Sequence, residues 1–118
     1  MKPSVRAAIA FIVGNINGRS NAVYDYSQGR YVQFSGRVTP SDVSIFDNDD
    51  RCHISGSGHN GEYRLFHYGN NSHIHLTISG NNFKGFDYGS NDHFSGTISN
   101  RSINLYDFGS GKYFSYMV

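Results

Sequence analysis

Three residue types that act together in many hydrolases lie close together in the C-terminal part of this chain: Asp87, His93 and Ser95. Ser95 falls in the middle of an expected strand, whereas a nucleophilic serine needs a strained turn and an oxyanion hole beside it. The combination also arises because Asp and Ser recur along the chain. We therefore expect a protein that is not an enzyme and that uses no cofactor.

The histidines are the main candidates for metal ligands. His73 and His75 are two residues apart, so they would point to the same face of a strand, where His67 or His93 could join them. The alternative is that these histidines only decorate a polar surface. We assign no metal site on this basis and keep His73 and His75 as the candidates.

The single cysteine and the acidic turn before it have limited chemical potential. Cys52 is the only cysteine, so no intrachain disulfide can form. Its neighbour His53 would point to the opposite face of a strand, which argues against a thiolate–imidazole pair. The acidic segment 47–50 lacks the glycine and the distant Glu of a helix-loop-helix calcium site. We interpret it as a solvated turn.

Two turns combine aromatic rings with Asn and Asp side chains, a composition that suits carbohydrate binding. The expected ligand-binding residues are Tyr68, Asn70, Asn71, Tyr88, Asn91 and Asp92. Because similar turns recur along the chain, several equivalent sites could act together. The alternative is that Gly, Ser and Asn serve only the tight hairpin turns that they favour.

The elements that would position these residues are repeats. An aromatic-Asp-aromatic unit recurs about every twenty residues, at Tyr24, Phe46, Phe66, Phe86 and Tyr106. A second unit of the Phe-Ser-Gly type follows each. Five copies of this two-part unit cover residues 22–118, after an N-terminal segment of residues 1–21. Each copy reads as two short strands joined by Gly- and Asn-containing turns, which gives ten strands.

The repeat predicts an all-β fold, and we expect an antiparallel meander that forms a barrel or a sandwich. A β-solenoid with one repeat per coil is the alternative. A solenoid would stack Asp25, Asp47, Asp87 and Asp107 in one column of like charges, which is unfavourable. The meander instead places strands that carry Asp beside strands that carry Ser and His.

The alternation of side chains predicts which face is buried. Applying one parity to the whole chain gives an apolar core face, with Gly96 making room for a ring. Its members are Tyr24, Tyr26, Phe34, Phe46, Ile54, Phe66, Tyr68, Ile74, Leu76, Ile78, Phe86, Tyr88, Phe94, Ile98, Tyr106, Phe108, Phe114 and Val118. The four Asp residues then lie on a wet face. Val43, Ile45, Leu65 and Leu105 share that wet face, so a helix or a partner subunit would have to cover them.

The N-terminal segment fits a short helix from Pro3 to Val13 that packs on the sheet and ends at Gly14 or Gly18. The alternative is a secretory signal with small residues up to Ala22. The apolar run is too short for a transmembrane span. We favour the helix, and with it a cytoplasmic over a secreted location.

Composition narrows the function further. The formal net charge is +1 and no basic stripe occurs, so we expect no nucleic-acid partner. We expect a non-enzymatic structural or protein-interaction module, with self-association as one outcome. The second hypothesis is a multivalent carbohydrate-binding module, which would be favoured by turn aromatics exposed in a ring.

Overall fold

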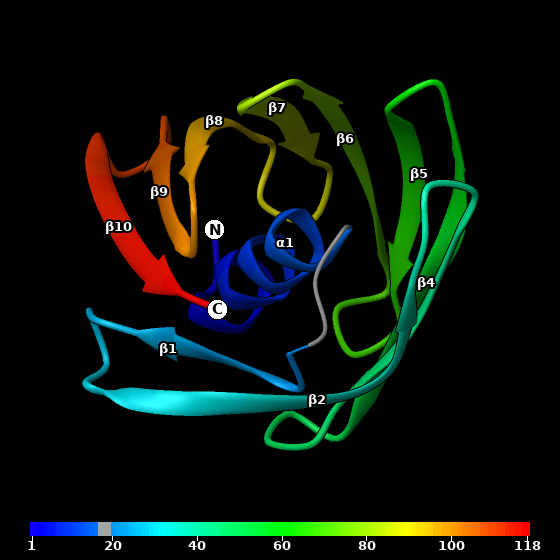
Figure 1. Ribbon diagram of the computed structural model, residues 1–118, viewed down its shortest axis with the longest axis horizontal. Helices are drawn as coiled ribbons and strands as arrows, with labels where there is room; N and C mark the ends of the chain where they lie inside the picture. Colours follow the sequence, from blue (N-terminus) through cyan, green and yellow to red (C-terminus); the bar gives the residue numbers. More distant parts are fainter. Residues whose placement is uncertain (17–19) are drawn as a thin grey trace.

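The computed structural model describes residues 1–16 and 20–118 as one helix and ten strands. The elements are α1 (Pro3–Asn15), β1 (Ala22–Asp25), β2 (Arg30–Val38), β3 (Asp42–Asp47), β4 (Cys52–His59), β5 (Glu62–His67), β6 (Ser72–Ser79), β7 (Asn82–Asp87), β8 (Asp92–Ser99), β9 (Ser102–Asp107) and β10 (Lys112–Met117). Each strand pairs antiparallel with its neighbours in sequence, and β1 also pairs with β10, which closes a barrel (Figure 1). The expected all-β meander is confirmed, as a barrel.

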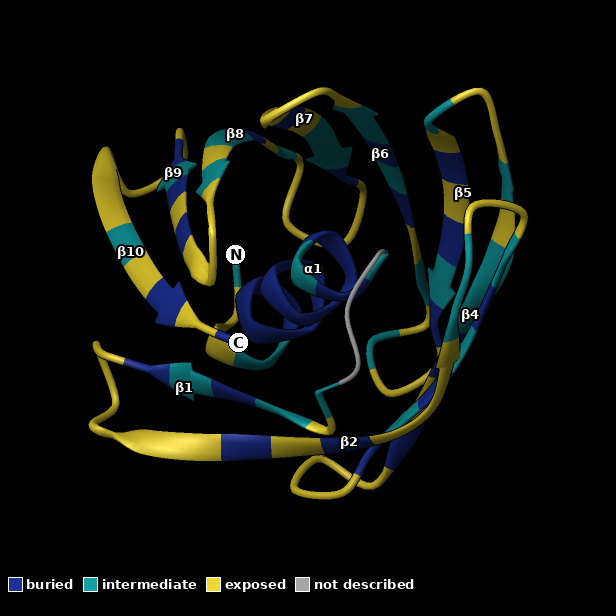
Figure 2. Ribbon diagram, viewed as in Figure 1, coloured by how far each residue is buried: buried dark blue, intermediate teal, exposed yellow. Residues whose placement is uncertain are grey.

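Helix α1 lies inside the ring of strands (Figure 1). Eight of its apolar residues, from Val5 to Val13, are at most 4% exposed, and Figure 2 shows the helix as almost entirely buried. A ten-stranded barrel is wider than the eight-stranded barrels whose interior side chains fill by themselves, so the helix supplies the missing core. The helix therefore covers Val43, Ile45, Leu65 and Leu105 as expected, but from within the barrel.

The helix begins with Pro3 in its first turn, where a missing N–H costs nothing. It continues through Gly14 to Asn15, so Gly14 is not its end. Gly18, the other expected end, lies outside the described residues. Among the described residues, no helix is long and apolar enough to cross a membrane.

The predicted core face is right for the even-numbered strands and wrong for the odd-numbered ones. Phe34, Ile54 and Phe94 point inward and are at most 1% exposed. On odd strands the inward residues are those of the other parity, such as Leu65, which lies opposite Ile74. The aromatic residues of the odd strands and the turns that were expected in the core therefore lie outside the barrel: Tyr24, Tyr26, Phe46, Phe66, Tyr68, Phe86, Tyr88, Tyr106 and Phe108.

The four repeated Asp residues are fully buried, not wet: Asp25, Asp47, Asp87 and Asp107 are each 0% exposed. Each ends an odd strand and accepts backbone N–H groups of the following turn through Oδ1. Asp87 accepts from Gly89 at 3.0 Å and Asp107 from Gly109 at 2.9 Å. An Asx turn of this kind fixes the hairpin. The repeated Asp is therefore a turn-forming residue, and we call this end of the barrel the rim.

Inward-facing glycines let the strands curve closely around the helix. A Cβ at Gly56 would overlap the carbonyl oxygen of Arg64 on the neighbouring strand. The ring of Phe83 lies over Gly96, as expected from the sequence, and the ring of Phe94 lies over Gly85. These positions are therefore reserved for glycine by neighbouring atoms.

Candidate functional site

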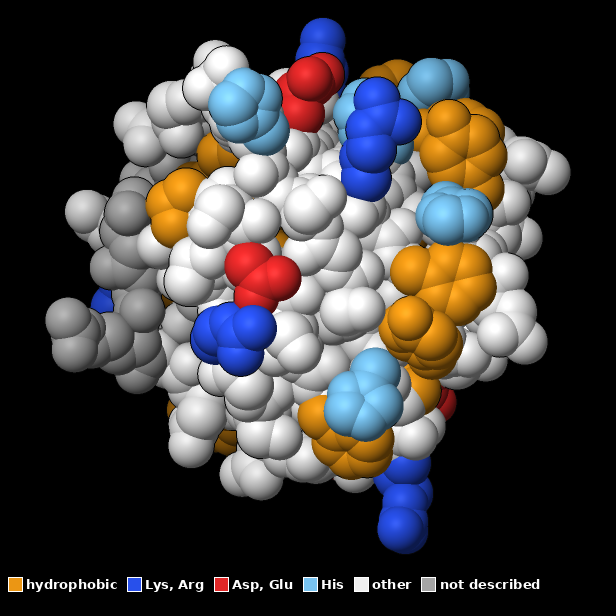
Figure 3. Space-filling view, turned by 90° about the vertical axis from the view of Figure 1, so that its right-hand side faces the viewer, with side chains coloured by type: hydrophobic (Ala, Val, Ile, Leu, Met, Phe, Trp, Pro, Cys, Tyr) orange, Lys and Arg blue, Asp and Glu red, His pale blue; other side chains and the backbone are white. Residues whose placement is uncertain are grey.

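Outward-facing rings form a band of several ring groups around the barrel next to the rim, which we call the aromatic belt. Its members are Tyr24, Tyr26, Tyr31, Phe46, His53, Phe66, Tyr68, His73, Phe86, Tyr88, His93, Tyr106, Phe108 and Tyr113. Strand pairing sets the order, because Phe66 lies opposite His73 and Phe86 opposite His93. Figure 3 shows part of the belt as a column in which hydrophobic and histidine side chains alternate.

Within the belt, a half-buried ring on the strand supports an exposed ring in the turn. Tyr68 stands edge-on to Phe66 with ring centroids 4.8 Å apart, and Tyr88 stands edge-on to Phe86 at the same distance. Phe108 repeats the arrangement against Tyr106 at 4.9 Å. The exposed fractions are 53% for Tyr68, 56% for Tyr88 and 57% for Phe108. The repeat thus presents rings in a fixed orientation.

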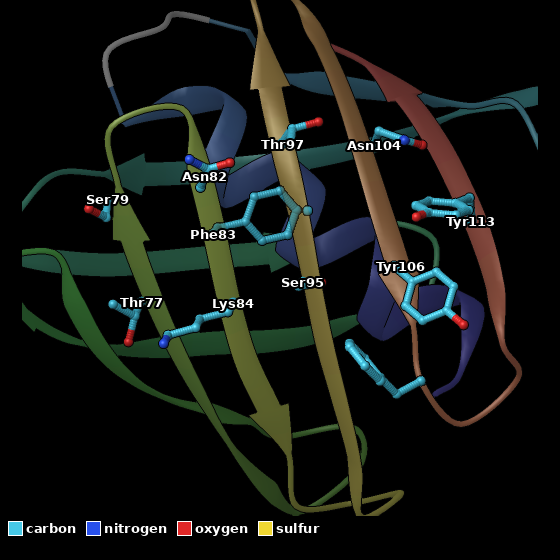
Figure 4. Close-up of a pocket in the computed structure, with 12 residues that line it drawn as sticks. Thr77, Ser79, Asn82, Phe83, Lys84, Ser95, Thr97, Asn104, Tyr106 and Tyr113 are labelled. Atoms are coloured by element: carbon cyan, nitrogen blue, oxygen red, sulfur yellow. The ribbon is translucent and has the colours of Figure 1, made fainter.

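A hollow with both polar and apolar lining adjoins the belt over β6 to β10, with a volume of about 650 Å³. Figure 4 shows its hydroxyl and amide side chains, among them Ser79, Asn82 and Thr97, with Tyr106 and Tyr113 at one side. A rigid aromatic wall beside hydrogen-bonding groups can hold a ligand that has both an apolar face and polar edges.

A second hollow of about 830 Å³ lies over β4 to β6. It is lined by Tyr68 and Tyr88 of the belt together with His73, His75 and Arg64. Four of the residues singled out from the sequence therefore meet in one place. The imidazole Nε2 of His75 lies 4.0 Å from Oε1 of Glu62. In the described part of the chain, His73 and His75 belong to no group of three metal-ligating side chains.

The other expected ligand-binding residues serve the turns. Asn71 and Asn91 have φ angles of 47° and 58°, the left-handed conformation that Asn tolerates. Asn70 donates through Nδ2 to Oγ of Ser72 at 3.1 Å, and Asp92 lies opposite buried Asp87. Asn70 and Asp92 therefore lie at the rim.

The hydrolase-like combination does not assemble. Asp87 points into the barrel, whereas His93 and Ser95 lie on its outer face. The sheet separates the carboxylate from the other two groups, so the three residues cannot act as a triad.

One group at the rim was not found from the sequence: Asp50, Cys52 and His67, which we call the rim cluster. Sγ of Cys52 lies 3.9 Å from Nε2 of His67 and 3.8 Å from Oδ2 of Asp50. The imidazole partner of the thiol is therefore His67, fifteen residues away, and not the adjacent His53. The signal in the sequence is that His67 replaces the Asp found in the other four copies of the repeat.

Burial favours the neutral forms of the thiol and the imidazole in the rim cluster. Burial raises the pKa of the Cys52 thiol, and a hydrogen bond from the Gly69 backbone only partly opposes this. Burial lowers the pKa of His67, partly offset by the charges of Asp50 and Asp47. A neutral thiol beside a neutral imidazole is not an activated nucleophile.

The comparisons with known proteins add no relative. No protein-family model, curated protein or solved structure matches this chain.

Proposed function

We propose that this protein is a non-enzymatic carbohydrate-binding module that binds glycans through the aromatic belt and the adjoining hollows. The observation that carries the proposal is the ring of exposed turn aromatics. Tyr26, Tyr68, Tyr88 and Phe108 occupy equivalent turns and are each more than half exposed, from 53% to 57%. Exposed apolar groups that gather on one part of a surface mark interaction sites.

The chemistry of the belt matches the chemistry of a sugar ring. The C–H face of a pyranose is apolar and its edge carries hydroxyl groups, so it can stack on Tyr68 or Tyr88 and bond to side chains such as His73, His75 and Ser55. Because the supporting rings hold the exposed ones in place, little side-chain entropy is lost on binding.

Repetition strengthens weak single sites. The edge-on pair of exposed and supporting ring occurs in four of the five copies, the second copy having Asn48 in place of the exposed ring. A polysaccharide that contacts two such sites gains effective concentration at the second. We therefore expect higher affinity for long glycans than for short oligosaccharides.

A protein-interaction role receives less support. Val43, Ile45, Leu65 and Leu105, which would have marked a partner surface, are at most 1% exposed beneath α1. The closed barrel also leaves none of the ten described strands with a free edge to which another chain could add. The belt itself is the large apolar feature that remains on the surface.

The test is binding of the full chain to a panel of polysaccharides, by affinity electrophoresis and then by calorimetry with the best ligand. Tyr68→Ala and Tyr88→Ala should each lower the affinity roughly tenfold, since one stacked ring contributes about 1.4 kcal/mol. The control Arg37→Ala changes an exposed residue of β2 outside the belt and should leave binding unchanged. Unaltered binding after Tyr26, Tyr68, Tyr88 and Phe108 are all changed to Ala would refute the proposal.

A further inference from the structure

The repeat brings three positions together at the rim in each copy: a residue of the turn, the first residue of the following strand, and the buried residue that ends the next odd strand. In consecutive copies these positions hold Asp50, Cys52 and His67, then Asn70, Ser72 and Asp87, then Ser90, Asp92 and Asp107. Gly69, Gly89 and Gly109 pack against Cys52, Ser72 and Asp92 in the same manner. The residues of the rim cluster can therefore be compared with the residues at the equivalent positions of the following copies.

The rim cluster differs from the two following sets in all three positions at once. In the next set, Asn70 donates to Ser72 at 3.1 Å. In the one after, the amino group of Met1 lies 3.1 Å from Asp92 and 3.5 Å from Asp107. The polar side chains of both of these sets therefore have neutral or cationic partners. Only the rim cluster combines a thiol, an imidazole and a carboxylate, which is a set of ligands that zinc prefers.

The spacing of the ligand atoms is close to that of a tetrahedral site. Zn–S bonds of about 2.3 Å and Zn–N or Zn–O bonds of about 2.1 Å put sulfur about 3.6 Å from each other ligand atom. The sulfur of Cys52 lies 3.9 Å from Nε2 of His67 and 3.8 Å from Oδ2 of Asp50, and all three atoms lie within 4.8 Å of one another. Asp50 is on an exposed turn and can move the remaining distance.

A buried carboxylate beside the cluster lacks a partner. Asp47 is 0% exposed and lies directly opposite Cys52 in the strand pairing. Its Oδ1 accepts from the backbone of Asp49 and Asp50, but among the described residues its Oδ2 has no hydrogen-bond partner. No ion pair of the described residues involves Asp47 or Asp50. A nearby cation would balance this negative charge.

The surroundings can support and admit an ion. A Cβ at Gly69 would lie 2.8 Å from the sulfur and 3.3 Å from Cε1 of His67, so glycine leaves space beside both ligands. Cys52 and Gly69 also line an open hollow of about 560 Å³ that leads in from the surface. The backbone of Gly69 hydrogen-bonds to the sulfur, as outer groups do around metal-bound thiolates.

We propose that Asp50, Cys52 and His67 bind one zinc ion, with water at the fourth position. The thiol releases its proton when the Zn–S bond forms, and the proton of the imidazole then resides on Nδ1. The carbonyl of His67 can accept that proton's hydrogen bond. In the structure the N–H of Asn70 donates both to Nδ1 of His67 at 3.1 Å and to the carbonyl oxygen of His67 at 3.2 Å. Protonation of Nδ1 ends the first of these bonds, and the bond to the carbonyl oxygen keeps the turn closed. This site does not depend on glycan binding.

The experiment titrates the metal-free full chain with Zn²⁺ against a chromophoric chelator, and with Co²⁺ as a spectroscopic probe. The variants are Asp50→Asn, Cys52→Ser and His67→Asp, singly and together. They copy the residues that the same barrel already holds at the next set, Asn70, Ser72 and Asp87, so the fold is expected to tolerate them. His73→Gln and His75→Gln are the matched controls on the outer surface.

We expect one Zn²⁺ per chain and a thiolate-to-cobalt charge-transfer band with Co²⁺. Cys52→Ser or His67→Asp should weaken Zn²⁺ binding at least about 100-fold, and the two control variants should leave it unchanged. The cobalt band is read from the unaltered chain, so it does not depend on any variant. Absence of that band, full affinity in the triple variant, or loss of binding in a control variant would overturn the assignment.

Discussion

Phe34 and Phe66 were both expected in the core from their parity, but the structure places Phe34 inside the barrel and Phe66 in the belt. Truncation of each to Ala therefore tests the placement of the core. Phe34 is 1% exposed and its ring stacks on Phe11 of α1 with centroids 4.6 Å apart. Phe66 is half-buried on the outer face.

The structure sets the expected magnitudes. Phe34→Ala removes a fully buried ring and leaves a cavity against the helix, which costs about 3–5 kcal/mol. That is a fifth or more of the roughly 5–15 kcal/mol that stabilises a typical domain, and it lowers Tm by roughly 10–20 °C. Phe66→Ala loses partial burial and two edge-on contacts, with Tyr68 and His73, or about 1–2 kcal/mol.

The assay is equilibrium urea unfolding of the two variants, followed by a double-mutant cycle between Phe34 and Phe11. The stacked pair should show a coupling of about 0.5–1.5 kcal/mol, because each ring loses its partner when the other is removed. Equal losses in Phe34→Ala and Phe66→Ala, or no coupling to Phe11, would show that the helix does not pack inside the barrel as described.

Three further predictions concern the turns, the strand curvature and the response to alkali. Asp87→Ala should lower the free energy of unfolding in urea by about 1–3 kcal/mol, because the hydrogen bonds from Gly89 and Ser90 are lost. Asp87→Asn keeps an acceptor and should cost under about 1 kcal/mol. Equal losses in the two variants would contradict the turn-forming role of Asp87. Gly56→Ala should lower the free energy of unfolding by about 1–3 kcal/mol, because the new Cβ would overlap the Arg64 carbonyl oxygen. The control Ser57→Ala changes the neighbouring residue on the outer face and should have almost no effect. If Gly56→Ala were equally harmless, the strands must be able to move apart. Burial, with a smaller effect of Asp25, raises the pKa of Tyr116. Above about pH 10 the unfolded chain therefore releases this proton first, and the free energy of unfolding falls with rising pH. The fall should be smaller in Tyr116→Phe, and parallel pH profiles of the two proteins would contradict the prediction.

The repeat predicted ten strands, because a twenty-residue period with Gly and Asn turns leaves room for two short strands in each copy. The choice of a meander over a β-solenoid needed the further argument that a solenoid would stack like charges. A single parity applied to the whole chain could not predict which face of each strand is buried. Asp87 pairs with Asp92 across a four-residue turn and Ser99 with Ser102 across a two-residue turn, so each hairpin joins residues of opposite parity. An even loop length therefore reverses the inward parity from strand to strand.

The sequence indicated that the helix is buried on all sides more clearly than our expectation of a helix packed on the sheet took into account. Residues 5–13 are apolar on every side except at Arg6, and a helix that is apolar all round is buried all round. The rim cluster was harder to foresee, because Cys52 and His67 meet only through strand register. Aligning the five copies would have shown that His67 departs from the Asp consensus, but not which side chain it would face.

The helix inside the barrel also bears on how such a chain can change in evolution. Each duplicated or deleted unit alters the barrel by two strands, and barrel diameter grows with strand number. Four units would close around a space too narrow for a helix with side chains, and six would leave gaps around it. Small residues such as Ala7, Ala8 and Ala10 already fit α1 closely to five units. Copy number in this architecture is therefore tied to a segment that lies outside the repeats, and gain of a unit requires a matching change in the helix.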